Sequence, residues 1–218
     1  MTSTHLVDVA PERLAGWVER FTASHGPLSW SVLTDDPAGA WEARAQDGSW
    51  AALRSWRPVP RGGSAGPEPG WEAPPALLVV LARRGGYAVA LVGPDGALER
   101  HKVGTRHVQS RTAAGGWSQQ RFARRRGNQA DALVEAVAGH TSRLLEEASA
   151  ARGAAPEGLV LGGDRSLADA VLEELPAATA SVRGLPRRVL WDLPDPRRRV
   201  LDDAVRRGRA VRVEVHNA

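Results

Sequence analysis

The chain has 218 residues, of which 42% are apolar, and a formal net charge of +4. This length suits one large domain, or one domain with a smaller appended unit, and the apolar content is enough for a hydrophobic core. The lack of cysteine excludes disulfides, thiolate metal sites and cysteine nucleophiles. No segment approaches the roughly 20 apolar residues of a membrane span, and residues 1–17 lack the basic head and apolar core of a signal peptide. We therefore expect a cytoplasmic protein without a membrane partner.

The beginning of the chain is predicted to contain one short helix and several strands. Apolar residues at helical spacing, with Pro11 near the start, predict an amphipathic helix over residues 10–24. Strands are expected over residues 28–33, 40–45 and 49–56. Four tryptophans fall on these strands: Trp30, Trp41, Trp50 and Trp56. They could form a surface on which RNA bases stack, but we favour a small core under a sheet, because tryptophan dominates the packing of small cores.

Residues 57–76 are rich in proline and glycine, which indicates a loop or linker without regular structure. This is the one credible internal boundary of the sequence. We accordingly divide the chain into a Trp-rich N-terminal α+β extension, residues 1–75, and a second domain, residues 76–218.

The second domain opens with an antiparallel meander. The apolar run over residues 76–82 predicts a strand buried on both faces, and glycine-containing turns separate it from strands over residues 87–92 and 97–103. A loop over residues 104–117 leads into a long helix, which is expected to begin at Ser118 or Gln119 and to end near Ala151.

The remainder alternates between strands and helices. Strands are expected over residues 158–161, 187–191 and 210–215, and helices over residues 166–175 and 195–208. A meander followed by this alternation predicts an α/β fold, with a mixed sheet and flanking helices.

The usual signatures of metal and nucleophile chemistry are missing from the sequence. The six histidines are scattered, with no pair at metal-ligand spacing, and neither a phosphate-binding loop nor a nucleophile elbow is present. Ser118 follows a glycine pair but has no evident His and Asp partners, which argues against a serine hydrolase. We therefore expect no metal and no cofactor.

The turn Gly162-Gly163-Asp164 lies between a predicted strand and a predicted helix, where backbone amides could hold a phosphate. We favour a tight turn in which Asp164 is the N-cap of the helix. An N-cap carboxylate would itself occupy the position of the anion.

Positive charge is concentrated around the loop that precedes the long helix. Between residue 100 and Asp131 there is no acidic residue, while eight cations occur: Arg100, Lys102, Arg106, Arg111, Arg121, Arg124, Arg125 and Arg126. A cationic cluster of this kind favours an anionic partner, and RNA is the leading candidate.

The end of the loop reads Gly115-Gly116-Trp117-Ser118-Gln119-Gln120. Adjacent glycines let the backbone approach a crowded partner closely, and a helix start favours negative charge nearby. Glutamine does not titrate, so neither glutamine is a general base. Either could orient a water molecule, while a neighbouring backbone N–H stabilises a developing oxyanion. The pattern alone also allows a glycine hinge before an arginine-faced helix.

The order of strands, loop and helix resembles the catalytic middle domain of archaeo-eukaryotic peptide-chain release factors, in which a Gly-Gly-Gln tip enters the peptidyl transferase centre. The closer resemblance is to the Vms-like release factors, including their bacterial branch. Their tip reads Gly-Ser-Gln or Gly-Gly-Trp-Ser-Gln and is followed by a basic helix. Here the matching residues are Gly115, Gly116, Trp117, Ser118 and Gln119, with Arg121, Arg124, Arg125 and Arg126 downstream.

The resemblance covers roughly residues 76–216, and it implies an RNase H-like release-factor catalytic domain. Two departures concern the tip, because Trp117 separates the glycine pair from Ser-Gln, and Gln119 and Gln120 are adjacent. Either glutamine could position the water; we favour Gln119, which keeps the Ser-Gln pair in register. The sequence has no stop-codon-reading domain, so a codon-specific terminator is not expected.

The resemblance implies a peptidyl-tRNA hydrolase that rescues stalled translation complexes as a monomer, with the large ribosomal subunit and peptidyl-tRNA as partners. The implied catalytic residues are Gly115, Gly116, Ser118, Gln119 and Gln120. The implied RNA-binding residues are Arg106, Arg111, Arg121, Arg124, Arg125 and Arg126. Two alternatives are a non-catalytic ribosome- or RNA-binding module and an RNase that cuts the tRNA acceptor end.

Overall fold

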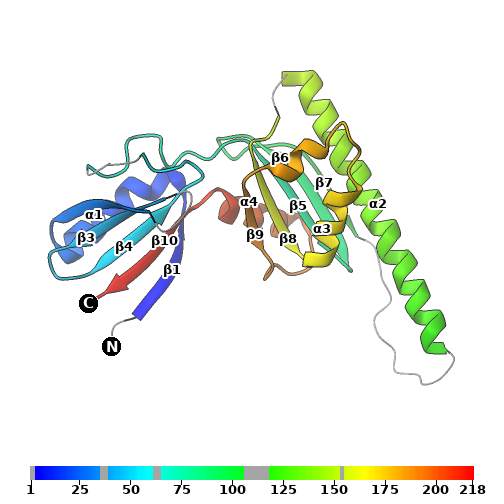
Figure 1. The fold of residues 1–218 in the computed structure, drawn as a ribbon, viewed down its shortest axis with the longest axis horizontal. Helices are drawn as coiled ribbons and strands as arrows, with labels where there is room; N and C mark the ends of the chain where they lie inside the picture. The colour runs from blue at the N-terminus through cyan, green and yellow to red at the C-terminus, as the bar shows by residue number, and fades with distance from the viewer. Residues whose placement is uncertain (1–2, 35–38, 61–64, 106–117, 153–154) are drawn as a thin grey trace. The chain divides into compact units, whose positions relative to one another are not determined.

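The described residues form two five-stranded sheets, each in a separate unit of the chain (Figure 1). The computed structural model describes residues 3–34, 39–60, 65–105, 118–152 and 155–218, and side chains of the long helix from Gln129 to Ala151. The first unit comprises residues 1–74 and 206–218, and the second comprises residues 75–205.

The first unit is an antiparallel sheet with one helix. Its strand order is β1-β10-β4-β3-β2, and every pair of neighbours is antiparallel. Its elements are β1 (Ser3–Val9), the 3-10 turn η1 (Pro11–Arg13), α1 (Leu14–His25), β2 (Leu28–Leu33), β3 (Ala40–Ala45), β4 (Trp50–Arg54) and β10 (Val211–Asn217). The predicted helix and three strands are confirmed, whereas strand β1 was not predicted.

The last strand of the chain belongs to this first sheet, and residues 206–218 are part of the first compact unit, whereas the sequence pattern places them with residues 76–205. β10 lies between β1 and β4 and pairs with both along its length. Its side chains alternate, with Val211, Val213 and Val215 buried and the residues between them partly exposed. An apolar strand face is stable when it is buried in a hydrophobic core, and these three valines pack in the core of the first unit.

Tryptophans fill much of that core. Trp41 is 2% exposed, and Trp30 packs edge-on against it with ring centroids 6.2 Å apart. The core interpretation is therefore confirmed for these two residues. Trp50 stacks on His216, and Trp56 donates a hydrogen bond from Nε1 to the carbonyl oxygen of Gly208.

The second unit contains a mixed sheet with strand order β7-β6-β5-β8-β9. β5, β6 and β7 form the predicted antiparallel meander, and β8 and β9 run parallel to β5. The elements are β5 (Leu77–Arg83), β6 (Gly86–Val92), β7 (Leu98–Thr105), α2 (Ser118–Arg152), β8 (Gly158–Gly163), α3 (Arg165–Glu174), the 3-10 turn η2 (Ala180–Gly184), β9 (Arg187–Leu190) and α4 (Arg198–Arg209), whose last four residues are assigned to the first unit. The predicted α/β arrangement of mixed sheet and helices is confirmed.

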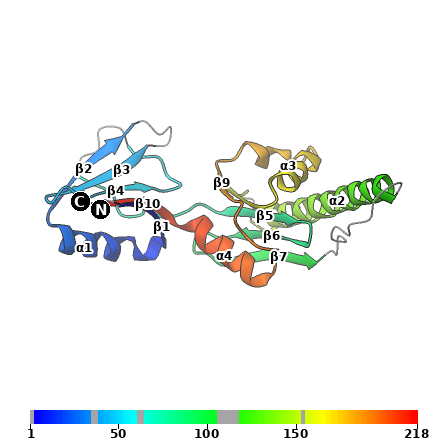
Figure 2. The same cartoon turned by 90° about the horizontal axis from the view of Figure 1, so that it is seen from below.

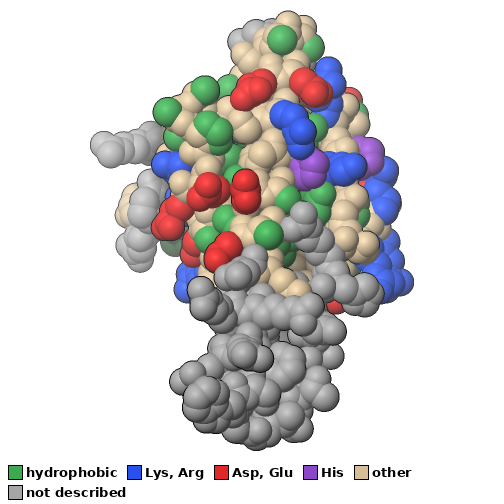
Figure 3. All heavy atoms as spheres, turned by 90° about the vertical axis from the view of Figure 1, so that its right-hand side faces the viewer, with side chains coloured by type: hydrophobic (Ala, Val, Ile, Leu, Met, Phe, Trp, Pro, Cys, Tyr) green, Lys and Arg blue, Asp and Glu red, His purple; other side chains and the backbone are tan. Residues whose placement is uncertain are grey.

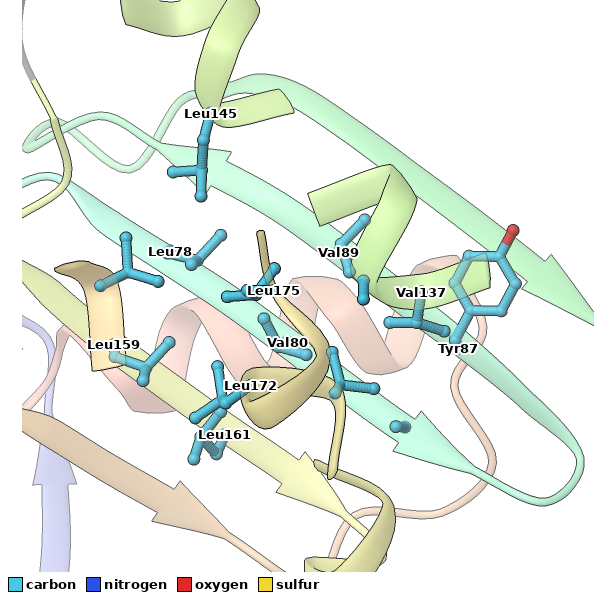
Figure 4. Packing of buried hydrophobic residues seen from close by; sticks show 14 of the residues in the cluster. Leu78, Val80, Tyr87, Val89, Val137, Leu145, Leu159, Leu161, Leu172 and Leu175 are labelled. Atoms are coloured by element: carbon cyan, nitrogen blue, oxygen red, sulfur yellow. The ribbon is translucent and has the colours of Figure 1, made fainter. Parts of the chain in front are cut away.

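The core of the second unit lies between this sheet and two helices. Figure 2 shows α2 and α3 on one face of the sheet and α4 on the other. On the first face, Leu78 and Val80 of β5 meet Val137 of α2 and Leu172 of α3, all of them buried (Figure 4). Each such side chain contributes about 1.5–3 kcal/mol through burial. The strand is buried on both faces, as its continuous apolar run predicts.

Within the residues that the structure places, none of the helices combines the length and the apolar character needed to cross a membrane.

A buried charge on β10 tests whether this strand completes the first unit. Val213 is fully buried, so Val213→Asp should destabilise the first unit by about 3 kcal/mol or more, because its carboxylate would have no partner. Urea unfolding followed by tryptophan fluorescence measures this, since six of the eight tryptophans lie in residues 1–74. Asn217→Asp, at the exposed end of the same strand, is the control and should change little. An unchanged midpoint for Val213→Asp would contradict the assignment.

Candidate functional site

The candidate site lies where the meander passes into the long helix. β7 ends at Thr105 and α2 begins at Ser118. Of the predicted site residues, Gly115, Gly116, Arg106 and Arg111 lie outside the described residues. The others are in the first turns of α2, where the structure describes the backbone: Ser118, Gln119, Gln120, Arg121, Arg124, Arg125 and Arg126. The predicted helix start is therefore confirmed.

The start of α2 presents backbone donors rather than acceptors. The first N–H groups of an α-helix have no acceptor within the helix, and Ser118, Gln119 and Gln120 supply three of them. No acidic residue occupies this first turn. The helix dipole therefore adds a partial positive charge at the position of the two glutamines, where it stabilises an anion or a developing negative charge.

The helix is anchored to the sheet well beyond the candidate site. Among its described side chains, the first that is fully buried is Leu133, and Val137 and Leu145 follow on the same stripe. Ser118 precedes Leu133 by about 22 Å of helix, at about 1.5 Å of rise per residue. In Figure 1 the first turns of α2 extend past the ends of the strands. The site is therefore at the N-terminal end of α2, whereas the part of α2 that packs on the sheet contains Leu133, Val137 and Leu145.

An aromatic contact between β6 and α2 lies against the end of β7. The ring of Tyr87, in β6, stacks on His140, in α2, with centroids 5.5 Å apart and planes 19° apart. Gly104 lies directly against this ring, because a Cβ at Gly104 would be only 2.4 Å from Cε1 of Tyr87. Arg143 donates a hydrogen bond to Nδ1 of His140 over 2.7 Å. These contacts fix the strand end that leads into residues 106–117.

The sequence analysis did not single out this contact. One signal was present: a glycine within a strand pattern often marks a place where another group approaches the backbone closely. Gly104 was instead assigned to the loop, although β7 continues to Thr105. The identity of the contacting residue could not be read from the sequence, because Tyr87 and His140 belong to other elements.

The turn at Asp164 is a helix cap. Oδ1 of Asp164 accepts hydrogen bonds from the backbone N–H of Ser166, at 3.1 Å, and from its hydroxyl, at 2.8 Å. The carboxylate therefore occupies the start of α3, as the favoured interpretation predicted.

Within the part of the chain that the structure describes, no group of three or more His, Asp and Glu side chains is arranged to hold a metal ion.

A comparison with protein families finds a match to a release-factor family. The family model described as "Actinobacteria/chloroflexi VLRF1 release factor" matches residues 75–214. The matched segment includes all of α2 and the residues between it and β7. No curated protein matches the sequence.

A double-mutant cycle tests the contact at the base of the site. Gly104→Ala should destabilise the second unit by about 1–3 kcal/mol, because the added Cβ overlaps the ring of Tyr87. In a Tyr87→Ala background the same change should cost much less, because the ring is gone. Urea unfolding monitored by far-ultraviolet circular dichroism measures both costs. Equal costs in the two backgrounds would show that Gly104 is not required by this ring.

Proposed function

Because the chain belongs to the Actinobacteria/chloroflexi VLRF1 release factor family, we propose that it is a peptidyl-tRNA hydrolase that frees nascent peptides from stalled ribosomal complexes. Membership of a release-factor family indicates a release-factor-like role in ribosome rescue. The finer assignment is supported by one observation above all: the Gly-Gly-Trp-Ser-Gln-Gln segment ends in the first turn of α2, where backbone donors and neutral amides coincide.

In the proposed reaction, water attacks the ester carbonyl that joins the peptide to the 3′ end of the tRNA. The oxygen of water forms a bond to the carbonyl carbon, and the bond from that carbon to the tRNA oxygen breaks. The peptide leaves as a carboxylic acid, and the tRNA oxygen takes up a proton from the water. Glutamine cannot accept this proton, so it passes to the leaving oxygen directly or through other water molecules.

Gln119 would position the attacking water through its amide, with Gln120 as the other candidate. A backbone N–H at the start of α2 would stabilise the negative charge that develops on the carbonyl oxygen. Gly115 and Gly116 would let the chain enter a narrow site, and Ser118 would set the register of the tip. Catalysis of this kind depends on placement, because neither glutamine side chain gains or loses a proton.

The partners in this proposal are the large ribosomal subunit, at its peptidyl transferase centre, and peptidyl-tRNA. Arg106, Arg111, Arg121, Arg124, Arg125 and Arg126 would bind RNA phosphates, which position a protein without reading sequence. The protein would act as a cytoplasmic monomer. An RNase H-like architecture for the second unit belongs to the same proposal, and the mixed sheet of meander plus two parallel strands supports it.

The glutamines can be tested in a peptide-release assay with purified stalled large-subunit complexes. Gln119→Ala should lower the release rate at saturating protein by about 100-fold or more, since removal of one positioned hydrogen-bonding group costs about 10²–10³ in rate. Gln120→Ala should have a smaller effect. Gln129→Ala, in the same helix but about three turns further on, is the matched control and should release peptide at the parental rate.

Two results would contradict the proposed chemistry. If both single variants and the double variant release peptide at the parental rate, the glutamines do not position the water. If the tRNA is shortened on a denaturing gel, the protein is an RNase, because ester hydrolysis leaves the tRNA intact. A parental protein that binds the complex without releasing peptide would indicate a non-catalytic ribosome-binding module.

A further inference from the structure

A second surface with several cations lies on strand β7, outside the predicted RNA-binding residues. β7 is the outermost strand of its sheet, and Glu99, Arg100, His101 and Lys102 are four consecutive exposed residues on it, two of them cations. Successive side chains of a strand point to opposite faces, so Arg100 and Lys102 lie on the side of α2 and His101 lies on the side of α4. The ion pair between Arg100 and Glu147 of α2 agrees with this direction.

Helix α4 adds a further cation to the same strand. Nη1 of Arg198 lies 3.0 Å from Nε2 of His101. A guanidinium group can only donate hydrogen bonds, so Nε2 of His101 accepts this one. His101 thereby holds the Arg198 guanidinium at the edge of the sheet. We call Arg100, Lys102 and Arg198, with His101, the β7 edge.

The cations of the β7 edge are available to an external anion. The pairs Arg100–Glu147 and Arg198–Asp202 have N–O distances of 2.7 and 3.0 Å, but all four side chains are 41–58% exposed. Exposed ion pairs of this kind contribute only about 0–1 kcal/mol, so a phosphate can replace the carboxylate at little cost. Lys102 has no ion-pair partner among the described residues. Figure 3 shows the surface that lies at the right-hand side of Figure 1. Arginine and lysine side chains gather along one side of this surface, with histidine beside them.

Charged residues on an edge strand also have an ordinary role, since they prevent pairing with the edge of another sheet. That role requires a charge of either sign on the strand itself. It does not require an arginine from another helix that is held against the strand by a histidine. In addition, β7 leads directly into residues 106–117, so its cations are close in sequence to the candidate tip.

We propose that the β7 edge is a second RNA-binding surface, which binds backbone phosphates of ribosomal RNA or tRNA while the tip occupies the reaction centre. This inference rests on the proposed function for the identity of the RNA. Three phosphate contacts at this surface would add to those of the tip arginines and would fix the direction from which α2 approaches. The surface would affect affinity rather than the chemical step.

The test compares two triple variants of the full chain that lose the same charge. The first is Arg100→Gln, Lys102→Gln and Arg198→Gln. The control is Arg20→Gln, Arg165→Gln and Arg187→Gln, which removes three exposed cations from other elements. Binding to stalled large-subunit complexes is measured over a range of salt concentrations. The β7-edge variant should weaken binding about tenfold or more and reduce the slope of log affinity against log salt by about two to three, because each phosphate contact contributes about one.

The release rate at saturating protein distinguishes this proposal from the proposed function. The β7-edge variant should release peptide within about twofold of the parental rate once saturated, because the tip is unchanged. An unchanged salt slope, or an equal loss in the control variant, would overturn the β7 edge as a binding surface. A parental protein that releases no peptide would refute the proposed function, while the salt slopes would still decide whether the β7 edge binds RNA.

Lys102 also permits a test without mutation. It is the single lysine of the chain, so an amine-selective acylating reagent modifies only Lys102 and the terminal amine. Acylation of Lys102 should be slowed in the ribosomal complex, and the deproteinised RNA of that complex, ribosomal RNA and tRNA together, should slow it as well. Modification at the rate of the free protein in both cases would overturn the proposal. Protection by the intact complex but not by this RNA would also overturn it, because the partner would then be a ribosomal protein.

Discussion

The packing of α2 on the second sheet is the constraint on which the candidate site depends. Leu133, Val137 and Leu145 hold one stripe of the helix against β5, β6 and α3, and the Tyr87–His140 stack holds it near the end of β7. These contacts lie a considerable helix length from the glutamines. Because an α-helix is stiff over that distance, the sheet can set the direction of the tip without contacting it.

The proposed catalytic group is neutral, which makes this rigidity more important. An acid or a base contributes through its pKa as well as its position, whereas a glutamine contributes only through the position of its amide. In the proposed mechanism the cations therefore have a different task from the tip. The cations bind RNA. Because α2 is held in a fixed direction relative to its sheet, this binding determines where the tip places one water molecule.

The β7 edge and the tip would both contribute to RNA binding, but only the tip would contribute to catalysis. Arg198 reaches the edge through His101, so this part of the surface depends on where α4 packs and not on local sequence alone. The arginines after the tip are consecutive or nearly consecutive in one helix, so they need no such support. In this scheme, affinity is distributed over two surfaces while the chemistry remains at one.

The sequence by itself determined the meander, the long helix, its start at Ser118 or Gln119 and the cap at Asp164, because each depends on local periodicity or on a residue that acts on its own backbone. The sequence also contains the tip motif, and the resemblance to the release-factor family is visible in it. Only the tertiary structure decided that β10 pairs with β1 and β4, that Gly104 is required by Tyr87, and that Arg198 meets His101. Each of these joins residues that are distant in the chain, and an alternating or basic pattern does not specify its partner. Helix starts, caps and turns depend on residues that are neighbours in the chain. The partner of a strand or of a side chain is selected only when the whole chain packs.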